Sequence, residues 1–291
     1  MIMNNYCAII VAYNPDVILE KIIRSLNSQH CHIILINNSE EDISTVSPSL
    51  SVDIINNKKN IGIAAAQNLG IDFAMKKKFK FIFFLDQDTV ISKNFCSSMI
   101  SSFNQISSID NSIGCLVPNY INKQTKDQAK FLVVEENDYK LKSVYNQKNF
   151  KISNAISSGM LVKGDVFRNI KMRDDFFIDQ VDTAFCIDLF KKGFSIYVTG
   201  KNELIHSIGK TTKHSLFGKK VKTNNHNDTR KFFFIRNSIR LLKENDFNKG
   251  FKKYIFHQIV YTITVTLLFE ENKRKKVIAI LNGIRCGIFV K

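Results

Sequence analysis

The sequence predicts an α/β fold in which helices flank a largely parallel sheet. Residues 81–85 form an unbroken apolar run, which is typical of a strand buried on both faces. Residues 7–12 form a second such run, and helical and strand-like patterns alternate from there to about residue 200. Because a strand, a helix and a parallel strand connect by a right-handed crossover, this alternation favours neighbouring parallel strands.

The elements are expected in the following order. Tyr13-Asn14-Pro15-Asp16 follows the first strand, and Asn14 suits a helix N-cap with Pro15 at the first helical position. A helix from Asn60 to about Lys78 opens with small residues, which permit close packing on the sheet or a close approach of backbone to a ligand. The other expected elements are helices at 18–26, 92–105 and 182–192, and strands at 32–36, 54–55, 113–117, 131–134, 157–162 and 195–198.

Two carboxylates, Asp86 and Asp88, follow the central apolar run and are separated only by Gln87. In open α/β sheets, ligands bind just beyond the carboxyl ends of the strands. Two acids at such a place can share a hard divalent cation that also holds phosphate oxygens. For an isolated Asp-x-Asp, a solvated turn or a helix N-cap is the more common explanation, so the rest of the chain must decide between them.

The composition narrows the class of protein. Six cysteines are scattered with no Cys-x-x-Cys pair, which favours a reducing cytosol without disulfides or a zinc site. The first residues lack the basic segment and apolar core of a signal peptide. Residues 1–188 carry 20 Lys and Arg against 20 Asp and Glu, whereas residues 189–291 carry 22 against 6. A charge this uneven indicates a partner surface: an anionic membrane, a nucleic acid or a phosphate-rich substrate.

Five motifs then occur in one order along the chain. They are Ala-Tyr-Asn-Pro at 12–15, Asn60 with Gly62 and Asn68, Leu-Asp-Gln-Asp at 85–88, Phe-Phe-Ile-Asp-Gln-Val-Asp at 176–182 and Ile-His-Ser-Ile-Gly at 205–209. Each motif is weak alone, but together they resemble bacterial family 2 glycosyltransferases of the GT-A fold, in particular the rhamnosyltransferase-like subgroup, over about residues 6–240. The expected fold is therefore a Rossmann-like, mixed and mainly parallel sheet flanked by helices, with a helical, basic C-terminal extension.

The resemblance implies a role for each matching residue. Asp182 would be the general base that takes the proton from the acceptor hydroxyl, with Gly159 and Asp179 on the acceptor side. Asp88 would bind Mg²⁺ or Mn²⁺ on the donor diphosphate, and His206 would be a further metal or diphosphate contact. The nucleotide-sugar donor would be bound by Ala12, Tyr13, Asn14, Asn38, Asn60, Gly62, Asn68, Asp86 and Gln87.

Several of these residues have structural alternatives. His206 follows an apolar pair, where a histidine is often structural, and Asp179 can instead charge the N-terminus of the helix that follows it. Asp188 is expected to be a surface charge. The chain also departs from the family, since Asn37 stands where an Asp usually ends the strand, and Ala184 stands where an acidic residue usually follows the base.

The basic C-terminal third is expected to form an extension, so we divide the chain into a GT-A domain at 1–209 and an extension at 210–291. Residues 210–222 are predicted to form a mobile basic lid near the site. Residues 254–269 form an uncharged segment flanked by lysines, which as a helix would be about 24 Å long, short of the ~30 Å hydrocarbon core of a bilayer. The basic flanks favour an interfacial membrane helix, and a core helix of the extension is the alternative.

The sequence thus predicts an inverting, metal-dependent glycosyltransferase, cytoplasmic and peripheral on the inner face of the bacterial cell membrane. Its expected substrates are a dTDP- or UDP-sugar, with L-rhamnose from dTDP-rhamnose as the leading donor, and a lipid-linked saccharide in O-antigen or capsule synthesis. A UDP-hexose or galactofuranose donor is the alternative on the same fold. A non-catalytic basic protein that binds membranes or nucleic acid is a more distant alternative. It leaves the carboxylates unexplained, and because no nucleic-acid module is recognisable, no nucleic-acid partner is expected.

Overall fold

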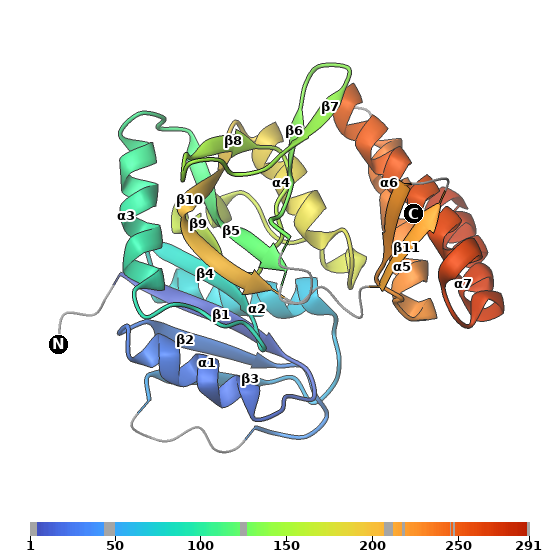
Figure 1. The fold of residues 1–291 in the computed structure, drawn as a ribbon. Coiled ribbons are helices and arrows are strands. Elements are labelled where there is room, and N and C mark those ends of the chain that lie inside the picture. Colours follow the sequence, from blue (N-terminus) through green and yellow to red (C-terminus); the bar gives the residue numbers. More distant parts are fainter. Residues whose placement is uncertain are drawn as a thin grey trace.

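The computed structural model describes residues 5–43, 50–122, 127–206, 212–216, 219–244, 246 and 248–289. Its central feature is an eight-stranded sheet with the strand order β3-β2-β1-β4-β9-β5-β10-β8 (Figure 1). These strands are β1 (Tyr6–Ala12), β2 (His32–Asn37), β3 (Val52–Asn56), β4 (Phe81–Asp86), β5 (Ile113–Asn122), β8 (Phe150–Ile152), β9 (Met160–Lys163) and β10 (Ser195–His206).

The sheet is mixed and mainly parallel, which confirms the expected fold class. β1 is parallel to β2 and β4, and β3 extends this parallel half. β9 inserts between β4 and β5 and is antiparallel to both, while β10 runs parallel to β5. Because β9 is antiparallel, its first residue, Met160, pairs with Phe84 near the carboxyl end of β4. The segment that leads into β9 therefore reaches the sheet edge at which β1, β2 and β4 end.

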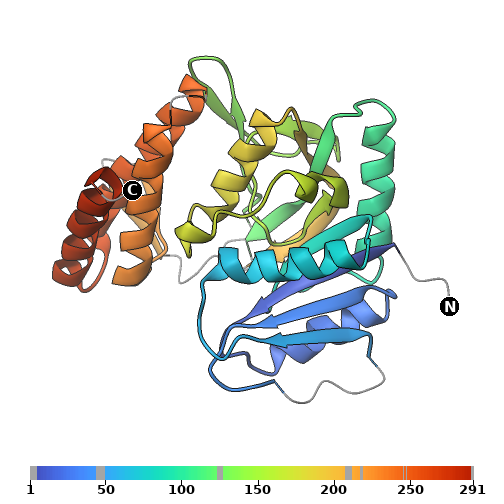
Figure 2. The same cartoon turned by 180° about the vertical axis from the view of Figure 1, so that it is seen from behind.

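The apolar runs at 7–12 and 81–85 form buried strands of the core, as their sequence predicts. Phe83 and Phe84 are at most 1% exposed, because helices cover both faces of this part of the sheet. Helix α1 (Ile18–Asn27) and helix α2 (Ile63–Lys76) lie on opposite faces of it (Figures 1 and 2). A Cβ on Gly70 of α2 would lie 2.6 Å from Ile9, so a small residue there lets α2 pack closely on β1. The remaining helices of this part are α3 (Phe95–Ser107), α4 (Val181–Lys191) and the 3₁₀ turns η1 (Gly164–Arg168) and η2 (Asp174–Phe176).

Three regions differ from the sequence-based expectation. Helix α1 begins at Ile18 with Val17 as its N-cap, so the expected cap at Asn14 with Pro15 in the first turn is wrong. The polar region 119–155 contains the expected strand β6 (Phe131–Val134), but also β7 (Tyr139–Lys142) and β8, which were not predicted. β7 is mostly exposed and forms a two-stranded ribbon with β6, so it lacks the apolar alternation that marks a buried strand. Where a basic lid loop is predicted, β11 (Thr212–Leu216) and β12 (Lys219–Thr223) form an antiparallel hairpin.

The extension contains three helices, α5 (Asp228–Lys243), α6 (Lys249–Phe269) and α7 (Lys273–Phe289), which gather to one side of the sheet (Figure 1). An ion triad joins them, since Lys231 and Lys276 donate to the two carboxylate oxygens of Glu270 at 2.8 and 2.9 Å. All three side chains are buried. Among the described residues, no helix combines the length and the apolar character that crossing a bilayer requires.

Candidate active site

Polar contacts join the ends of β1, β2 and β4 on the predicted donor side. The side-chain amide of Gln87 accepts from the Tyr13 N–H at 2.7 Å and donates to the Tyr13 carbonyl at 3.3 Å. The Asn38 N–H donates to the Ala12 carbonyl at 2.7 Å. The Asn14 N–H donates to the Ser39 hydroxyl at 2.8 Å. The structure therefore brings these five predicted donor residues together at one edge of the sheet.

A second group of predicted donor residues holds the loop before α2. The buried amide of Asn38 donates to the Asn60 side chain at 3.0 Å and to the Gly62 carbonyl at 3.2 Å. Gly62 has a φ of 85°, and a Cβ there would lie 2.7 Å from the Phe177 carbonyl oxygen. Glycine is thus required at this position by the approach of another backbone segment. Contact of these residues with the donor stays a prediction.

Asn68 and Gly159 also have visible packing roles. The Asn68 amide donates to the Met172 carbonyl at 2.8 Å and accepts from the Met172 N–H at 2.9 Å. Gly159 has a φ of 78°, and a Cβ there would lie 2.9 Å from the side chain of Pro118. The expected contacts of Asn68 with the donor and of Gly159 with the acceptor remain predictions.

Asp86 and Asp88 lie at a turn that follows β4 and contacts the segment before β9. Asp86 ends β4 and is half-buried, whereas Asp88 is exposed in the turn that follows. Thr89 closes the turn, because its N–H donates to the Asp86 carbonyl and its hydroxyl accepts from the Asp86 N–H, both at 3.1 Å. That hydroxyl also lies 3.1 Å from the Ser158 hydroxyl in a buried contact. The segment before β9 therefore fixes the turn that carries both carboxylates.

The predicted general base, Asp182, lies in the first turn of α4 and is half-buried. Burial raises the pKa of Asp182 to about 6, and the nearby carboxylates of Asp86 and Asp179 act in the same direction. Hydrogen bonds from the N–H and hydroxyl of Ser157 oppose this rise of the pKa. A carboxylate with a pKa near the working pH is suited to accept a proton from a substrate hydroxyl.

The loop before α4 has an unusual backbone that α5 stabilises. Phe177, Asp179 and Gln180 all have φ values near 60°, a region that non-glycine residues rarely adopt. The side-chain nitrogen of Asn237 donates to three carbonyls of this loop, those of Phe176 at 2.9 Å, Ile178 at 3.0 Å and Asp179 at 2.8 Å. Asn237 is fully buried, so these contacts persist only while α5 is docked.

Further side chains of α5 bind the same loop. The Arg230 guanidinium forms a two-pronged ion pair with Asp179, and Gln180 donates to the Ser238 hydroxyl at 2.9 Å. Burial lowers the pKa of Arg230, but the Asp179 hydrogen bond and the charges of Asp179, Asp182 and Asp86 raise it above its ordinary value. The positive charge of Arg230 thus interacts with the carboxylates of Asp182 and Asp86.

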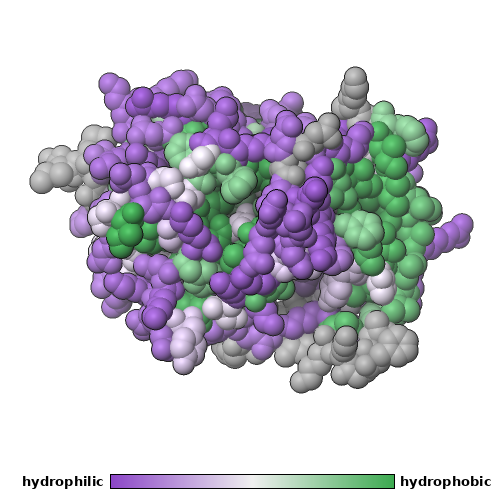
Figure 3. All heavy atoms as spheres, turned by 90° about the horizontal axis from the view of Figure 1, so that it is seen from above, coloured by the Kyte–Doolittle hydropathy of each residue, from purple (hydrophilic) through white to green (hydrophobic). Residues whose placement is uncertain are grey.

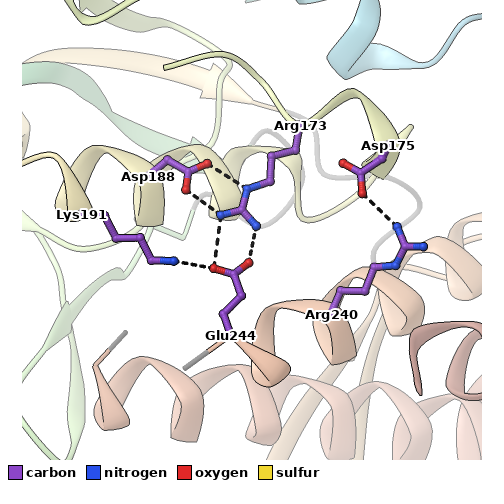
Figure 4. A network of polar contacts seen from close by, with 6 residues as sticks. All are labelled: Arg173, Asp175, Asp188, Lys191, Arg240 and Glu244. Carbon is purple, nitrogen blue, oxygen red and sulfur yellow. Dashed lines mark hydrogen bonds and ion pairs between the residues drawn. The ribbon is translucent and has the colours of Figure 1, made fainter. Parts of the chain in front are cut away.

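A network of ion pairs joins the start of this loop to α4 and α5 (Figure 4). Arg173 donates to both Asp188 carboxylate oxygens, at 2.9 and 2.6 Å, and to the Glu244 carboxylate. Lys191 also donates to Glu244, at 2.6 Å. The expectation that Asp188 is a surface charge is therefore wrong, because its side chain is only 23% exposed and is paired.

The predicted metal contacts are only partly described. The backbone of Ile205 pairs with Val90, so the end of β10 that carries His206 runs beside the turn containing Asp88. The His206 side chain lies outside what the structure describes. Within the described residues, no group of three or more Asp, Glu, His or Cys side chains converges on a cation position.

Four residues that shape this site belong to none of the motifs to which the resemblance gives a role: Ser157, Arg173, Arg230 and Asn237. The local sequence around Asn237 does not reveal the loop that Asn237 binds. Asn237 and Asp179 are 58 residues apart, and no local pattern reports such a contact. Ser157 was identified only as the first residue of the strand expected at 157–162.

Comparison with known proteins agrees with the motifs. Residues 7–171 match the model of "Glycosyl transferase family 2". The chain is 29% identical over 298 residues to a dTDP-rhamnosyl transferase, RfbF, of Shigella flexneri, and the match covers 97% of this chain and 96% of that protein. The resemblance inferred from the sequence is therefore confirmed.

The fold is also similar to a crystal structure of GalNAc-T7 with UDP, GalNAc and Mn²⁺. The TM-score is 0.59 at 12% sequence identity, and the match covers 98% of this chain. This chain spans 56% of the length of that protein. At this identity the similarity supports the architecture alone.

Proposed function

The chain belongs to glycosyl transferase family 2, and from that membership we propose that this glycosyltransferase moves L-rhamnose from dTDP-rhamnose, with inversion, to a lipid-linked oligosaccharide of a bacterial surface polysaccharide. The observation that supports this best is Asp182 in the first turn of α4, where burial and the charge of Asp86 raise its pKa to about 6. The relative that names dTDP-rhamnose as its donor covers nearly the whole chain. O-antigen and capsule are the polysaccharides we consider.

The residues present fit the divalent metal that this chemistry uses. Asp88 offers an exposed carboxylate at the end of β4, and hard cations such as Mg²⁺ bind one or two carboxylates together with substrate phosphates. Asp88 would hold Mg²⁺ or Mn²⁺, with His206 as a further contact. When bound, the ion neutralises charge on the departing nucleoside diphosphate.

Asp182 performs the proton transfer in this proposal. The acceptor oxygen attacks the anomeric carbon from the face opposite the diphosphate, and the new C–O bond forms as the bond to the diphosphate oxygen breaks. The hydroxyl proton moves to the Asp182 carboxylate. One displacement on one face inverts the anomeric configuration. The donor residues Tyr13, Asn14 and Gln87 would orient the nucleotide at the ends of β1 and β4.

A UDP-hexose or galactofuranose donor is the second candidate, because sugar pockets differ by a few hydrogen bonds on a shared fold. The non-catalytic alternative falls, since the family is one of glycosyltransferases. We retain the division into a GT-A domain at 1–209 and an extension at 210–291 as a proposal.

We also propose that the extension docks on the anionic inner face of the cell membrane, where a lipid-linked acceptor is found. Figure 3 shows hydrophobic residues gathered over the C-terminal helices. Phe256, Leu267, Leu268 and Leu281 are 48–58% exposed there. Residues 252–253 and 273–275 add lysines and an arginine, which complement anionic lipid headgroups.

Calorimetric titration tests the donor assignment. dTDP-rhamnose, UDP-glucose, UDP-galactose and GDP-mannose are titrated with and without Mn²⁺ into the wild type and into Asp88→Ala. We expect metal-dependent binding of dTDP-rhamnose alone, lost in Asp88→Ala and retained in Asp165→Ala, which removes an exposed carboxylate elsewhere. Binding of a UDP-sugar instead would favour the second candidate, and no binding of any donor would contradict the proposal.

A further inference from the structure

A cavity of about 300 Å³ lies between α5, α6 and β12, next to the predicted acceptor side. Its volume is at the small end of the range for ligand pockets, which suits a single sugar-sized group. Asp179 lines it, three residues before Asp182. A second cavity, of about 330 Å³ beside Phe190 and Phe251, is lined by none of the site carboxylates. The first cavity therefore borders the loop that precedes Asp182.

Two polar side chains of α6 line this cavity without partners. Gln258 and Thr262 are four residues apart, so they lie one above the other on the same face of the helix. Both are half-buried, and neither makes a side-chain hydrogen bond within the described residues. An amide and a hydroxyl each offer a donor and an acceptor, which is what recognition of a sugar hydroxyl needs.

His226 also lines the cavity and carries a hydrogen-bond donor. The Arg230 guanidinium lies 3.3 Å from its Nδ1, so that nitrogen accepts and the proton resides on Nε2. Burial and the charge of Arg230 lower the pKa of His226 to about 4, and the ring is therefore neutral at physiological pH. A neutral imidazole suits an uncharged ligand.

The cations that line the cavity are already paired with carboxylates. Arg230 is bound to Asp179, Lys231 to Glu270 at 2.8 Å, and Lys222 to Asp127 at 2.7 Å. A phosphate would have to displace these partners, whereas a polyhydroxyl group would not. Phe234 and Val265 supply apolar surface against which the C–H face of a sugar ring can pack.

We propose that this cavity binds the terminal sugar ring of the acceptor, with Gln258, Thr262 and His226 as its hydroxyl contacts. The assignment rests on the proposed glycosyltransferase reaction and adds the place at which the acceptor is recognised. Since Asp179 borders the cavity and Arg230 interacts with Asp182 and Asp86, a ring held there lies beside the loop that carries the base.

Ligand-observed NMR tests this assignment with methyl glycosides as probes. Methyl α-L-rhamnoside, methyl β-D-glucoside, methyl β-D-galactoside and methyl N-acetyl-β-D-glucosaminide are mixed separately with the full-length protein. We expect saturation transfer to at least one glycoside and a reduction of its affinity by about 2- to 10-fold in Gln258→Ala and in Thr262→Val, as the loss of one hydrogen bond predicts. Thr264→Val changes the same helix outside the cavity and should bind as the wild type does.

Other outcomes would overturn the assignment. Absence of transfer from all four glycosides, or equal binding by Gln258→Ala, Thr262→Val and the wild type, would exclude the cavity as a sugar site. Displacement of the glycoside by inorganic phosphate would point to an anion site instead. A parallel titration with dTDP-rhamnose separates the two proposals. Glycoside binding without donor binding contradicts the proposed donor, and donor binding without glycoside binding contradicts the cavity.

Discussion

Asn237 donates from its side-chain nitrogen to the backbone carbonyl of Asp179 across 2.8 Å, although 58 residues separate the two along the chain. The same nitrogen contacts two further carbonyls of the loop. Three residues of that loop have left-handed backbone angles immediately before the helix that carries Asp182. A residue of the C-terminal extension thus holds the backbone from which the predicted base projects.

Replacement of Asn237 by Ala should lower kcat by about 10- to 100-fold, because a loop that relaxes moves the base out of line with the acceptor. The KM for the donor should change less than kcat, since the predicted donor residues at the ends of β1, β2 and β4 do not bind Asn237. Steady-state kinetics with both substrates separates the two effects. Asn169→Ala, an exposed asparagine on the surface, is the matched control. An equal change of kcat and donor KM would instead indicate general loss of structure.

The rate of transfer should fall at acidic pH, because Asp182 must be ionised to accept the proton. With its pKa raised to about 6, kcat/KM should be half-maximal near pH 6 and fall about tenfold per unit below it. The acidic limb of the pH profile, in which kcat/KM falls below pH 6, is measured with the wild type. In Asp182→Asn the acidic limb should disappear, and the rate of transfer should fall by about 10²- to 10⁴-fold. An acidic limb near pH 4 in the wild type would contradict the role of burial.

Replacement of Arg230 by Met should move that acidic limb to higher pH by about one unit. The change removes a positive charge that stabilises the ionised forms of Asp179, Asp182 and Asp86. The pH profile of kcat/KM is again the measurement. Arg240→Met provides the control, because Arg240 lies on the same helix but pairs with Asp175 at 2.9 Å. A limb that stays at pH 6 in Arg230→Met would show that Arg230 does not act on the base.

Replacement of Glu270 by Gln should destabilise the extension by about 3–5 kcal/mol, since it leaves Lys231 and Lys276 buried together without a counter-charge. Urea unfolding measures the loss. Glu271→Gln, an exposed neighbour, should have an effect within about 0.5 kcal/mol. Comparable stability of the two variants would mean that the triad is solvated in solution.

Replacement of Phe256 and Leu268 by Asp should weaken membrane binding, because it places charge on the apolar face of α6. Sedimentation with phosphatidylcholine vesicles, with and without phosphatidylglycerol, measures the effect. Binding of the wild type should require the anionic lipid and weaken with salt. Ile109→Asp, which changes an exposed apolar residue outside the extension, should bind normally. Equal sedimentation of all variants would place the contact elsewhere.

Features that depend on residues close together in the chain could be predicted from the sequence, and features that depend on distant contacts could not. The apolar run from Phe81 to Leu85 predicted a strand, and Asp86 was identified as the residue at its end. Both predictions depend only on neighbouring residues in the chain. β7 escaped prediction since residues that are mostly exposed lack a pattern. Arg230 and Asn237 act on a loop that lies 51 to 61 residues earlier, so their roles emerge only once the chain is folded.

The contact between α5 and the loop at residues 176–180 also has a consequence for synthesis of the chain. All predicted donor residues lie before residue 90, whereas the side chains that secure the loop lie within residues 228–243. Domains fold from the N-terminus as the ribosome elongates them at ~5–20 residues per second. All predicted donor residues are therefore synthesised several seconds before α5, and we expect a chain truncated before residue 228 to be inactive, because it lacks the side chains that hold the loop before Asp182.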